Sequence, residues 1–320
     1  MAAIGQSDSR ETRRKRFRRD RPPAMRLTDD DITIIRHVAK HRFLRSTHLL
    51  RLMPGRSEKK LIERLGALYH NDYLDRPRAQ LDYYARAGSA PMVYALGNRG
   101  AQMLRQHGGL VANHVDWTWK NRSAGRTFIE HTLLTADVMV AATRAAQSQP
   151  DLLLIEPGDI IARAPEAAQR TKNPFLLAVR SQVNGSPQEL AVVPDAVFGF
   201  DFTAERKRKY FFVEADRGTM PVMRANLDHT SIYRKLVTYL AGGGATNAFG
   251  QQLGIGNFRV LTVTTSAERV KGMLAALQQA TRGAGSRQFL FATEDEICRA
   301  PDLFSVAWID GKGQRTSIAE

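Results

Sequence analysis

The 320-residue sequence has a single cysteine, Cys298, and no apolar run long enough to cross a membrane. One cysteine excludes an internal disulfide framework and a zinc site built from several cysteines. The arginines near the start have no apolar segment behind them, so no secretory signal is predicted. We therefore expect a cytoplasmic protein without membrane spans. Cys298 follows an acidic, helix-like stretch and is expected to be a buried structural thiol.

Acidic residues are also scarce: the chain has 32 Asp and Glu against 47 Lys and Arg. The shortage is confined to the first part of the chain. Residues 1–125 carry 25 basic and 12 acidic residues, a net charge of +13, whereas residues 126–320 carry 22 and 20, a net charge of +2. A concentrated positive charge attracts phosphate backbones or anionic membrane surfaces, and we expect the first part to bind nucleic acid.

Residues 1–26 contain nine Lys and Arg, few apolar residues and a closing Pro22-Pro23. This composition is typical of a disordered basic arm, which would contact DNA phosphates without reading sequence. A solvated tail is the alternative. The candidate phosphate contacts in the arm are Arg13, Arg14, Arg16, Arg18 and Arg19.

Residues 27–106 predict three short helices followed by a two-stranded ribbon. Thr28 or Asp29 can cap the first helix, and Ser57 starts the third. This order is typical of a winged helix-turn-helix domain, in which the third helix enters the major groove of DNA. A three-helix bundle with a hairpin is the alternative. The candidate DNA contacts are Lys59, Lys60 and Arg64 on the third helix and Arg76 and Arg78 beside the ribbon.

Residues 107–125, with Trp117 and Trp119, are predicted to connect two domains. Residues 126–320 then predict a long helix, several strands, and two further helix–strand pairs. One continuous strand is expected across Leu190–Phe200. The predicted fold is therefore α/β overall, with a winged helix followed by an α/β domain that has a mixed sheet.

Two acids stand at the end of the apolar run that begins at Lys209: Glu214 and Asp216. A third, Asp195, follows Pro194 at the start of another apolar segment. Buried strands rarely carry acids unless something pairs with them or binds them. Carboxylates from neighbouring strands suit a hard cation, so Asp195 and Glu214 are candidate ligands of Mg²⁺.

This pattern resembles the Pro-Asp and acid-x-Lys signature of restriction-endonuclease-like nucleases, in which Mg²⁺ activates water. Asp216 stands where that signature has its lysine, and Lys235 on the following helix could supply the ammonium instead. Glu130 could add a ligand. The candidate catalytic residues are Asp195, Glu214, Asp216 and Lys235. The alternative is a salt-bridged strand end, with Arg217 or Arg234 as a partner of the acids.

Several short blocks of this sequence resemble the replication-relaxation family of bacterial plasmid and mobile-element proteins, over about residues 27–265. The blocks are Leu27–Ile32 with His41–Leu44, Arg64-Leu65 with Tyr73–Arg76, Glu130–Leu133, Val193–Ala196 and Phe212–Thr219. The resemblance implies a winged-helix DNA-binding protein tied to plasmid replication or DNA relaxation. An acid at position 216 fits the family pattern.

The sequence thus favours a protein that binds double-stranded DNA and acts in replication, DNA relaxation or its regulation. Replication or mobilisation proteins are expected partners, and the formation of a homodimer is a further possibility that the sequence leaves open. The first alternative is a Mg²⁺-dependent endonuclease that uses Asp195 and Glu214. The second is a transcriptional regulator whose C-terminal domain senses a ligand or forms a dimer.

Overall fold

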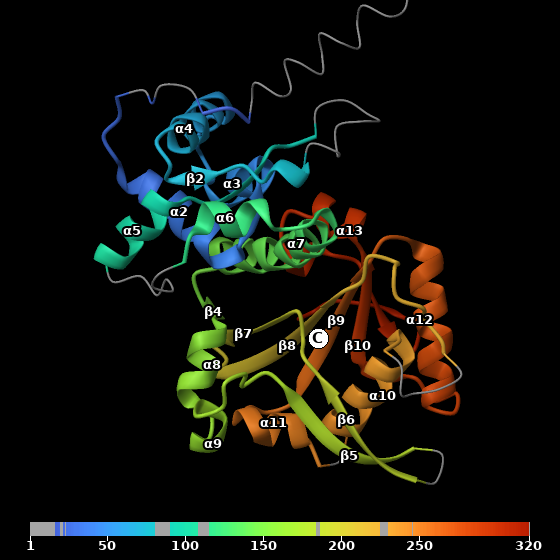
Figure 1. Ribbon diagram of the computed structural model, residues 1–320. Helices are drawn as coiled ribbons and strands as arrows, with labels where there is room; N and C mark the ends of the chain where they lie inside the picture. The colour runs from blue at the N-terminus through green and yellow to red at the C-terminus, as the bar shows by residue number, and fades with distance from the viewer. Residues whose placement is uncertain are drawn as a thin grey trace, which may run out of the picture. The chain divides into compact units, whose positions relative to one another are not determined.

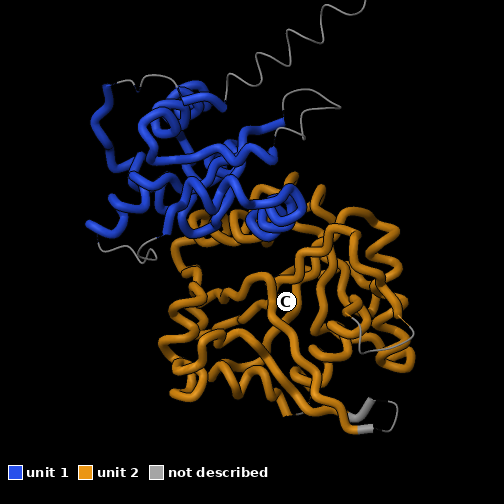
Figure 2. Tube along the Cα trace, in the orientation of Figure 1, with its two compact units in different colours: residues 1–136 blue, residues 137–320 orange. Residues whose placement is uncertain are grey.

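The computed structural model describes residues 17–19, 22, 24–80, 90–107, 115–183, 186–224, 230–244 and 246–319. The chain forms two compact units, residues 1–136 and residues 137–320, which Figure 2 shows in different colours. Each unit is described by itself below. Within the described residues, no helix has the length and apolar character needed to span a membrane.

Unit 1 combines short helices with a small sheet (Figure 1). Its elements are α2 (Asp29–His41), β1 (Phe43–Arg45), α3 (Ser46–Leu52), α4 (Glu58–His70), β2 (Leu74–Asp75), β3 (Val93–Leu96), α5 (Asn98–Gln106) and α6 (Trp117–Arg122). The three strands are antiparallel and lie in the order β1-β3-β2. The strand that follows β2 in the chain therefore lies between the other two.

Helix α2 shows how the sequence sets one of these boundaries. Thr28 forms a capping box with Asp31: the Asp31 Oδ2 accepts the Thr28 backbone N–H at 2.7 Å, and the Thr28 hydroxyl accepts the Asp31 N–H. This satisfies amide groups that the first helical turn leaves without partners. The inner face of α2 buries Ile34, Ile35 and Val38.

Helix α7 (Arg126–Ser148) contributes to both units, because the division falls at Ala136/Asp137. Ile129 and Leu133 in its first half pack with Phe43, Val93 and Ala95 of unit 1. The predicted boundary at residue 126 therefore differs from the observed one. The predicted connection, residues 107–125, contains α6, whose buried Asn121 donates to Asp75 Oδ2 and the Leu96 carbonyl. Its described part belongs to unit 1.

Unit 2 is built on a seven-stranded mixed sheet in the order β12-β11-β10-β9-β8-β7-β4. The prediction of an α/β fold with a mixed sheet is confirmed. The strands are β4 (Leu152–Ile155), β7 (Ala196–Phe202), β8 (Lys207–Ala215), β9 (Phe258–Thr264), β10 (Ser286–Thr293), β11 (Trp308–Gly311) and β12 (Arg315–Thr316). Strands β8, β9 and β10 are parallel to one another, and the other pairings are antiparallel.

The remaining elements of unit 2 are helices and a separate hairpin (Figure 1). They are α8 (Pro157–Arg163), α9 (Glu166–Gln169), β5 (Leu177–Val183), β6 (Ser186–Val192), α10 (Ile232–Gly243), α11 (Ala248–Leu253), α12 (Ala267–Ala280), α13 (Glu294–Arg299) and the 3-10 turn η2 (Leu303–Ser305). β5 and β6 pair antiparallel, and helices α10 and α12 connect the three parallel strands in succession.

One face of the sheet packs on α10, α11 and α12. Phe212 stacks on Phe258 with ring centroids 4.3 Å apart, and both rings lie close to Tyr239 of α10. A second cluster of aromatic rings includes Phe198, which stacks on Phe211 with ring centroids 5.2 Å apart, and Phe200, which contacts Phe304. These aromatic pairs fix β7, β8 and β9 next to one another.

Residues Leu190–Phe200 do not form the continuous strand that was expected. Val193, Pro194 and Asp195 separate β6 from β7, and the two strands belong to different sheets. Proline cannot donate a ladder hydrogen bond, which accounts for the break. The break places Asp195 directly before β7, at the edge where the candidate site lies.

Candidate functional site

Asp195 is fixed beside the end of β8 by two backbone contacts. Its N–H donates to the Val213 carbonyl at 2.9 Å, and its Oδ2 accepts the Ala215 N–H at 2.8 Å. These bonds extend the antiparallel pairing of β7 with β8, in which Ala196 lies opposite Val213. The half-buried Asp195 carboxylate is thus held at the backbone that flanks Glu214.

Glu214 is buried, with 5% of its surface exposed, and α10 satisfies both of its oxygens. Oε1 accepts the Tyr239 hydroxyl at 2.5 Å, and Oε2 accepts the ammonium of Lys235. Lys235 and Tyr239 are four residues apart, so they project from one face of the helix. The Ser231 hydroxyl caps the start of α10 through the Arg234 N–H, which sets this face toward β8.

The charges of this cluster influence one another. Burial raises the pKa of Glu214, and the ammonium of Lys235 offsets only part of that effect. Burial alone would lower the pKa of Lys235, but the carboxylates of Glu214 and Asp195 outweigh it and raise that pKa. Burial and the same two acids also raise the pKa of Tyr239 well above its ordinary value. Lys235 and Tyr239 therefore remain hydrogen-bond donors at neutral pH.

Asp216 faces a different set of partners. Its Oδ1 accepts Arg269 Nη2 at 2.8 Å, its Oδ2 accepts both Arg269 Nε and the Thr264 hydroxyl, and its N–H donates to the Val263 carbonyl. This bidentate pair is the strong form of a carboxylate–guanidinium contact. Ser266 caps α12 and so places Arg269 in its first turn. Asp216 thus ties β8 to α12, whereas Glu214 ties it to α10.

The structure therefore brings Asp195, Glu214 and Lys235 together and gives Asp216 a buried structural pair. Sequence reasoning missed Tyr239 and Arg269. The helical spacing from Lys235 could have indicated Tyr239, whereas Arg269 is 53 positions from Asp216 and has no local signal. Glu130, the suggested extra ligand, pairs with Arg126 one turn earlier, in the half of α7 that belongs to unit 1.

Some of the cations predicted to bind DNA have internal partners instead. Arg19 pairs with Asp72 and Asp75 and lies over the Tyr69 ring, while the Tyr69 hydroxyl donates to the Phe17 carbonyl. The part of the predicted arm that includes Phe17 and Arg19 is therefore packed on unit 1, which corrects the expectation that the whole arm is disordered. The guanidinium of Arg19 is therefore paired with carboxylates of unit 1.

Arg64 and Arg76 are likewise engaged. Arg64 pairs with the capping carboxylate of Asp31, whose side chain is fully buried, and donates to the Arg26 carbonyl. Arg76 lies over the rings of Tyr69 and Tyr94. Lys59, Lys60, Arg78 and Arg18 are exposed. Arg13, Arg14 and Arg16 lie outside the described residues.

Cys298 on α13 is exposed, so the expectation of a buried thiol was wrong. The apolar face of the six-residue helix is taken by Ile297, which is fully buried, and the neighbouring position turns outward. Ligand atoms of Cys298, Asp137 and Glu294 lie within 4.8 Å of one another.

The comparison with family models decides the family. The replication-relaxation model matches residues 35–249, which is more than half of the chain. The chain belongs to the replication-relaxation family. The matched segment contains Asp195, Glu214, Lys235 and Tyr239 and ends before Arg269. Neither the curated proteins nor the solved structures gave a match. Membership of the replication-relaxation family suggests a role in the replication or relaxation of a plasmid or mobile element.

Proposed function

We propose that this protein binds double-stranded DNA through unit 1, acting as a winged helix, in the replication or relaxation of a plasmid or mobile element. The observation that carries the proposal is the sheet order β1-β3-β2, with α3 and α4 inserted between β1 and β2. This arrangement resembles that of a winged helix, in which the third helix enters the major groove.

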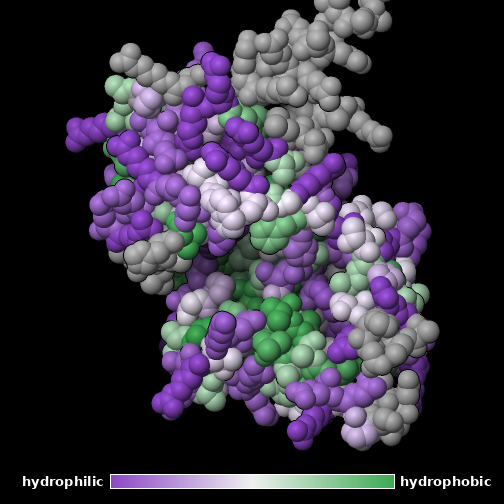
Figure 3. Space-filling model, viewed as in Figure 1, coloured by the Kyte–Doolittle hydropathy of each residue, from purple (hydrophilic) through white to green (hydrophobic). Residues whose placement is uncertain are grey.

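Helix α4 fits the role of the helix that enters the groove. Leu61, Leu65 and Leu68 bury one face, and Lys59 and Lys60 lie on the exposed face. The face of unit 1 in view is mainly hydrophilic (Figure 3). Because Arg19, Arg64 and Arg76 have internal partners, the phosphate contacts fall to Lys59, Lys60 and Arg78, together with Arg13, Arg14 and Arg16 of the basic arm.

Duplex binding at a series of salt concentrations tests this proposal. Lys59→Ala/Lys60→Ala should weaken binding and lower the salt slope by about 0.9 for each phosphate that the variant no longer neutralises. Lys172→Ala, an exposed lysine of unit 2, serves as the matched control and should change neither quantity. Wild-type affinity in the double variant would show that α4 does not face DNA.

A second candidate function, metal-dependent cleavage of a phosphodiester, is favoured by the contact of Lys235 with Glu214. The order β4, β7, β8, α10, β9 resembles that of a restriction-endonuclease-like core. Asp195 and Glu214 fit the first two parts of its motif, whereas Asp216 stands where the motif has its lysine. Two carboxylates with an adjacent ammonium fit Mg²⁺, which takes oxygen ligands. Asp195 and Glu214 would hold the metal, which polarises the phosphate and lowers the pKa of its bound water. Lys235 would stabilise the negative charge that develops on the phosphate.

This second function requires Glu214 to accept a metal in place of, or beside, its present donors. Nicking of supercoiled plasmid in Mg²⁺ or Mn²⁺ is the test. Asp195→Asn, Glu214→Gln and Lys235→Met should each abolish nicking while duplex binding persists. If the wild-type protein nicks neither supercoiled, linear nor single-stranded DNA with either metal, the cluster has a structural role only.

A further inference from the structure

A groove of about 690 Å³ lies at the opposite end of the sheet from the Glu214 cluster. Because β8, β9 and β10 are parallel, their first residues lie at one edge. The groove is formed there, by the start of β8 at Lys207, the start of β9 at Phe258, the start of β10 and the end of α10 at Gly243. Its volume is that of a pocket for a small molecule.

The lining of this groove carries five cationic side chains and no carboxylate among the described residues. The guanidinium of Arg208 forms an ion pair with Asp201 of β7. Lys207 and Arg287 are exposed, and Lys209 and Arg259 are half-buried. The ammonium of Lys209 donates to the Ala319 carbonyl. Arg287 Nε lies 3.7 Å from the Asp310 carboxylate, which also accepts the backbone N–H groups of Lys312 and Gln314. Such a lining attracts a ligand with more than one negative charge.

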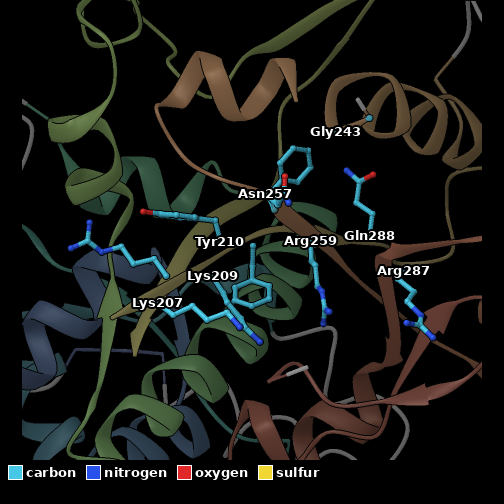
Figure 4. A pocket seen from close by; sticks show the side chains of 12 residues that line it. Lys207, Lys209, Tyr210, Gly243, Asn257, Arg259, Arg287 and Gln288 are labelled. Carbon is cyan, nitrogen blue, oxygen red and sulfur yellow. The ribbon is translucent and has the colours of Figure 1, made fainter. Parts of the chain in front are cut away.

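The cations and the neutral polar groups occupy different sides of the groove. In Figure 4 the side chains of Lys207 and Lys209 end close together, and those of Arg259 and Arg287 extend in the same direction. Asn257, Gln288 and Gly243 lie on the other side of the view. Tyr210 and Phe258 contribute aromatic rings to the lining. One side can therefore hold phosphate, while the other offers amides and rings of the kind that recognise a base.

We propose that this groove binds a nucleoside phosphate. Lys207, Arg259 and Arg287 hold the phosphate oxygens, and Lys209 adds positive charge beside them. Asn257 and Gln288 hydrogen-bond the edge of the base, whose plane packs on Tyr210. The nucleoside phosphate comes either as a free nucleotide or as a unit of a DNA strand. The groove lies in unit 2, so its occupation does not depend on the winged helix of unit 1.

The experiment measures binding of two probes to the full chain: a fluorescent dATP, and a labelled 5′-phosphorylated tetrathymidylate. The tetranucleotide is too short to form the duplex that a winged helix reads. Lys207→Ala/Arg287→Ala is the test variant, because both side chains are exposed and their loss should leave the fold intact. Lys312→Ala, an exposed lysine outside the groove lining, is the matched control.

A loss of at least tenfold in dATP affinity with the test variant, and not with the control, supports a free nucleotide. The same loss confined to the tetranucleotide supports a DNA strand. Asn257→Ala should weaken each base-containing probe but leave the competition by inorganic phosphate unchanged. If the wild-type protein binds neither probe, or if the test variant binds both as the wild type does, the proposal is overturned. Should the double variant unfold, Arg287→Ala alone provides the comparison.

Discussion

Lys235 of α10 donates to Glu214 of β8, and this ion pair joins the helix to the buried end of the strand. The Glu214 side chain is 7% exposed and that of Lys235 24%. A carboxylate at this depth costs free energy unless a cation stays beside it, so the pair is the central electrostatic contact of the candidate site.

Lys235→Met should lower the free energy of unfolding by about 3 kcal/mol, because it leaves the buried Glu214 carboxylate without its ammonium partner. Urea denaturation measures the change. The double variant Glu214→Gln/Lys235→Met removes both charges and should recover part of the loss. A cost below about 1 kcal/mol for the single variant would mean that water reaches Glu214.

Asp216→Asn should leave any metal-dependent nicking intact, because the Asp216 carboxylate is directed to Arg269 and not to the Glu214 cluster. The same change should lower the melting temperature, since it breaks the bidentate pair between β8 and α12. Nicking rate and thermal unfolding are measured on the same preparation. Loss of nicking without loss of stability would indicate that Asp216 takes part in catalysis.

Arg64→Ala should destabilise the protein by about 2–3 kcal/mol and leave the salt slope of DNA binding unchanged. The reason is that Arg64 balances the fully buried carboxylate that caps α2. Thermal unfolding and duplex titrations report the two effects separately. A stable variant with a smaller salt slope of DNA binding would indicate that Arg64 contacts DNA.

His37→Gln should make stability less dependent on pH between 4 and 6.5. Burial lowers the pKa of His37 to about 4, with a smaller effect from Lys40, whereas the ordinary value is 6.5. The unfolded chain therefore binds more protons in this range, so the stability that neutral His37 contributes is complete above pH 6.5 and is lost as the pH falls toward 4. Urea midpoints at several pH values test this. His41 shifts in the same direction, so the variant should retain some slope.

Much of unit 2 could be predicted from sequence because its signals are local. The apolar run of β8 and the helical spacing of α10 are sufficient to place Glu214 and Lys235 at one edge of the sheet. The break between β6 and β7 at Pro194, which sets Asp195 beside them, was not predicted. The partner of Asp216 was not predictable in this way. Arg269 reaches it only through the parallel pairing of β8 with β9, which brings Val263 and Thr264 alongside.

Charge counts proved a weaker guide to individual residues than to the chain. Arg19, Arg64 and Arg76 belong to the basic excess of the first part, yet carboxylates and tyrosine rings of unit 1 hold them. Net charge describes a long-range field, whereas these contacts depend on side chains that folding brings within a few ångströms. Lys59 and Lys60 are exposed, unlike Arg19, Arg64 and Arg76, because the opposite face of α4 is the one that is buried.

Strand β8 carries a cation of the groove at its first residue, Lys207, and the buried acid Glu214 near its last. At about 3.3 Å per residue, the two positions are roughly 23 Å apart. Because β8 is paired with β7 on one side and β9 on the other, the distance between these two positions is fixed. A mononucleotide is too short to reach from one end to the other, whereas a DNA strand of several nucleotides is long enough. If the groove and the Glu214 cluster bind one DNA strand, the smallest oligonucleotide whose affinity falls on substitution at either end of β8 should be long enough to span this distance.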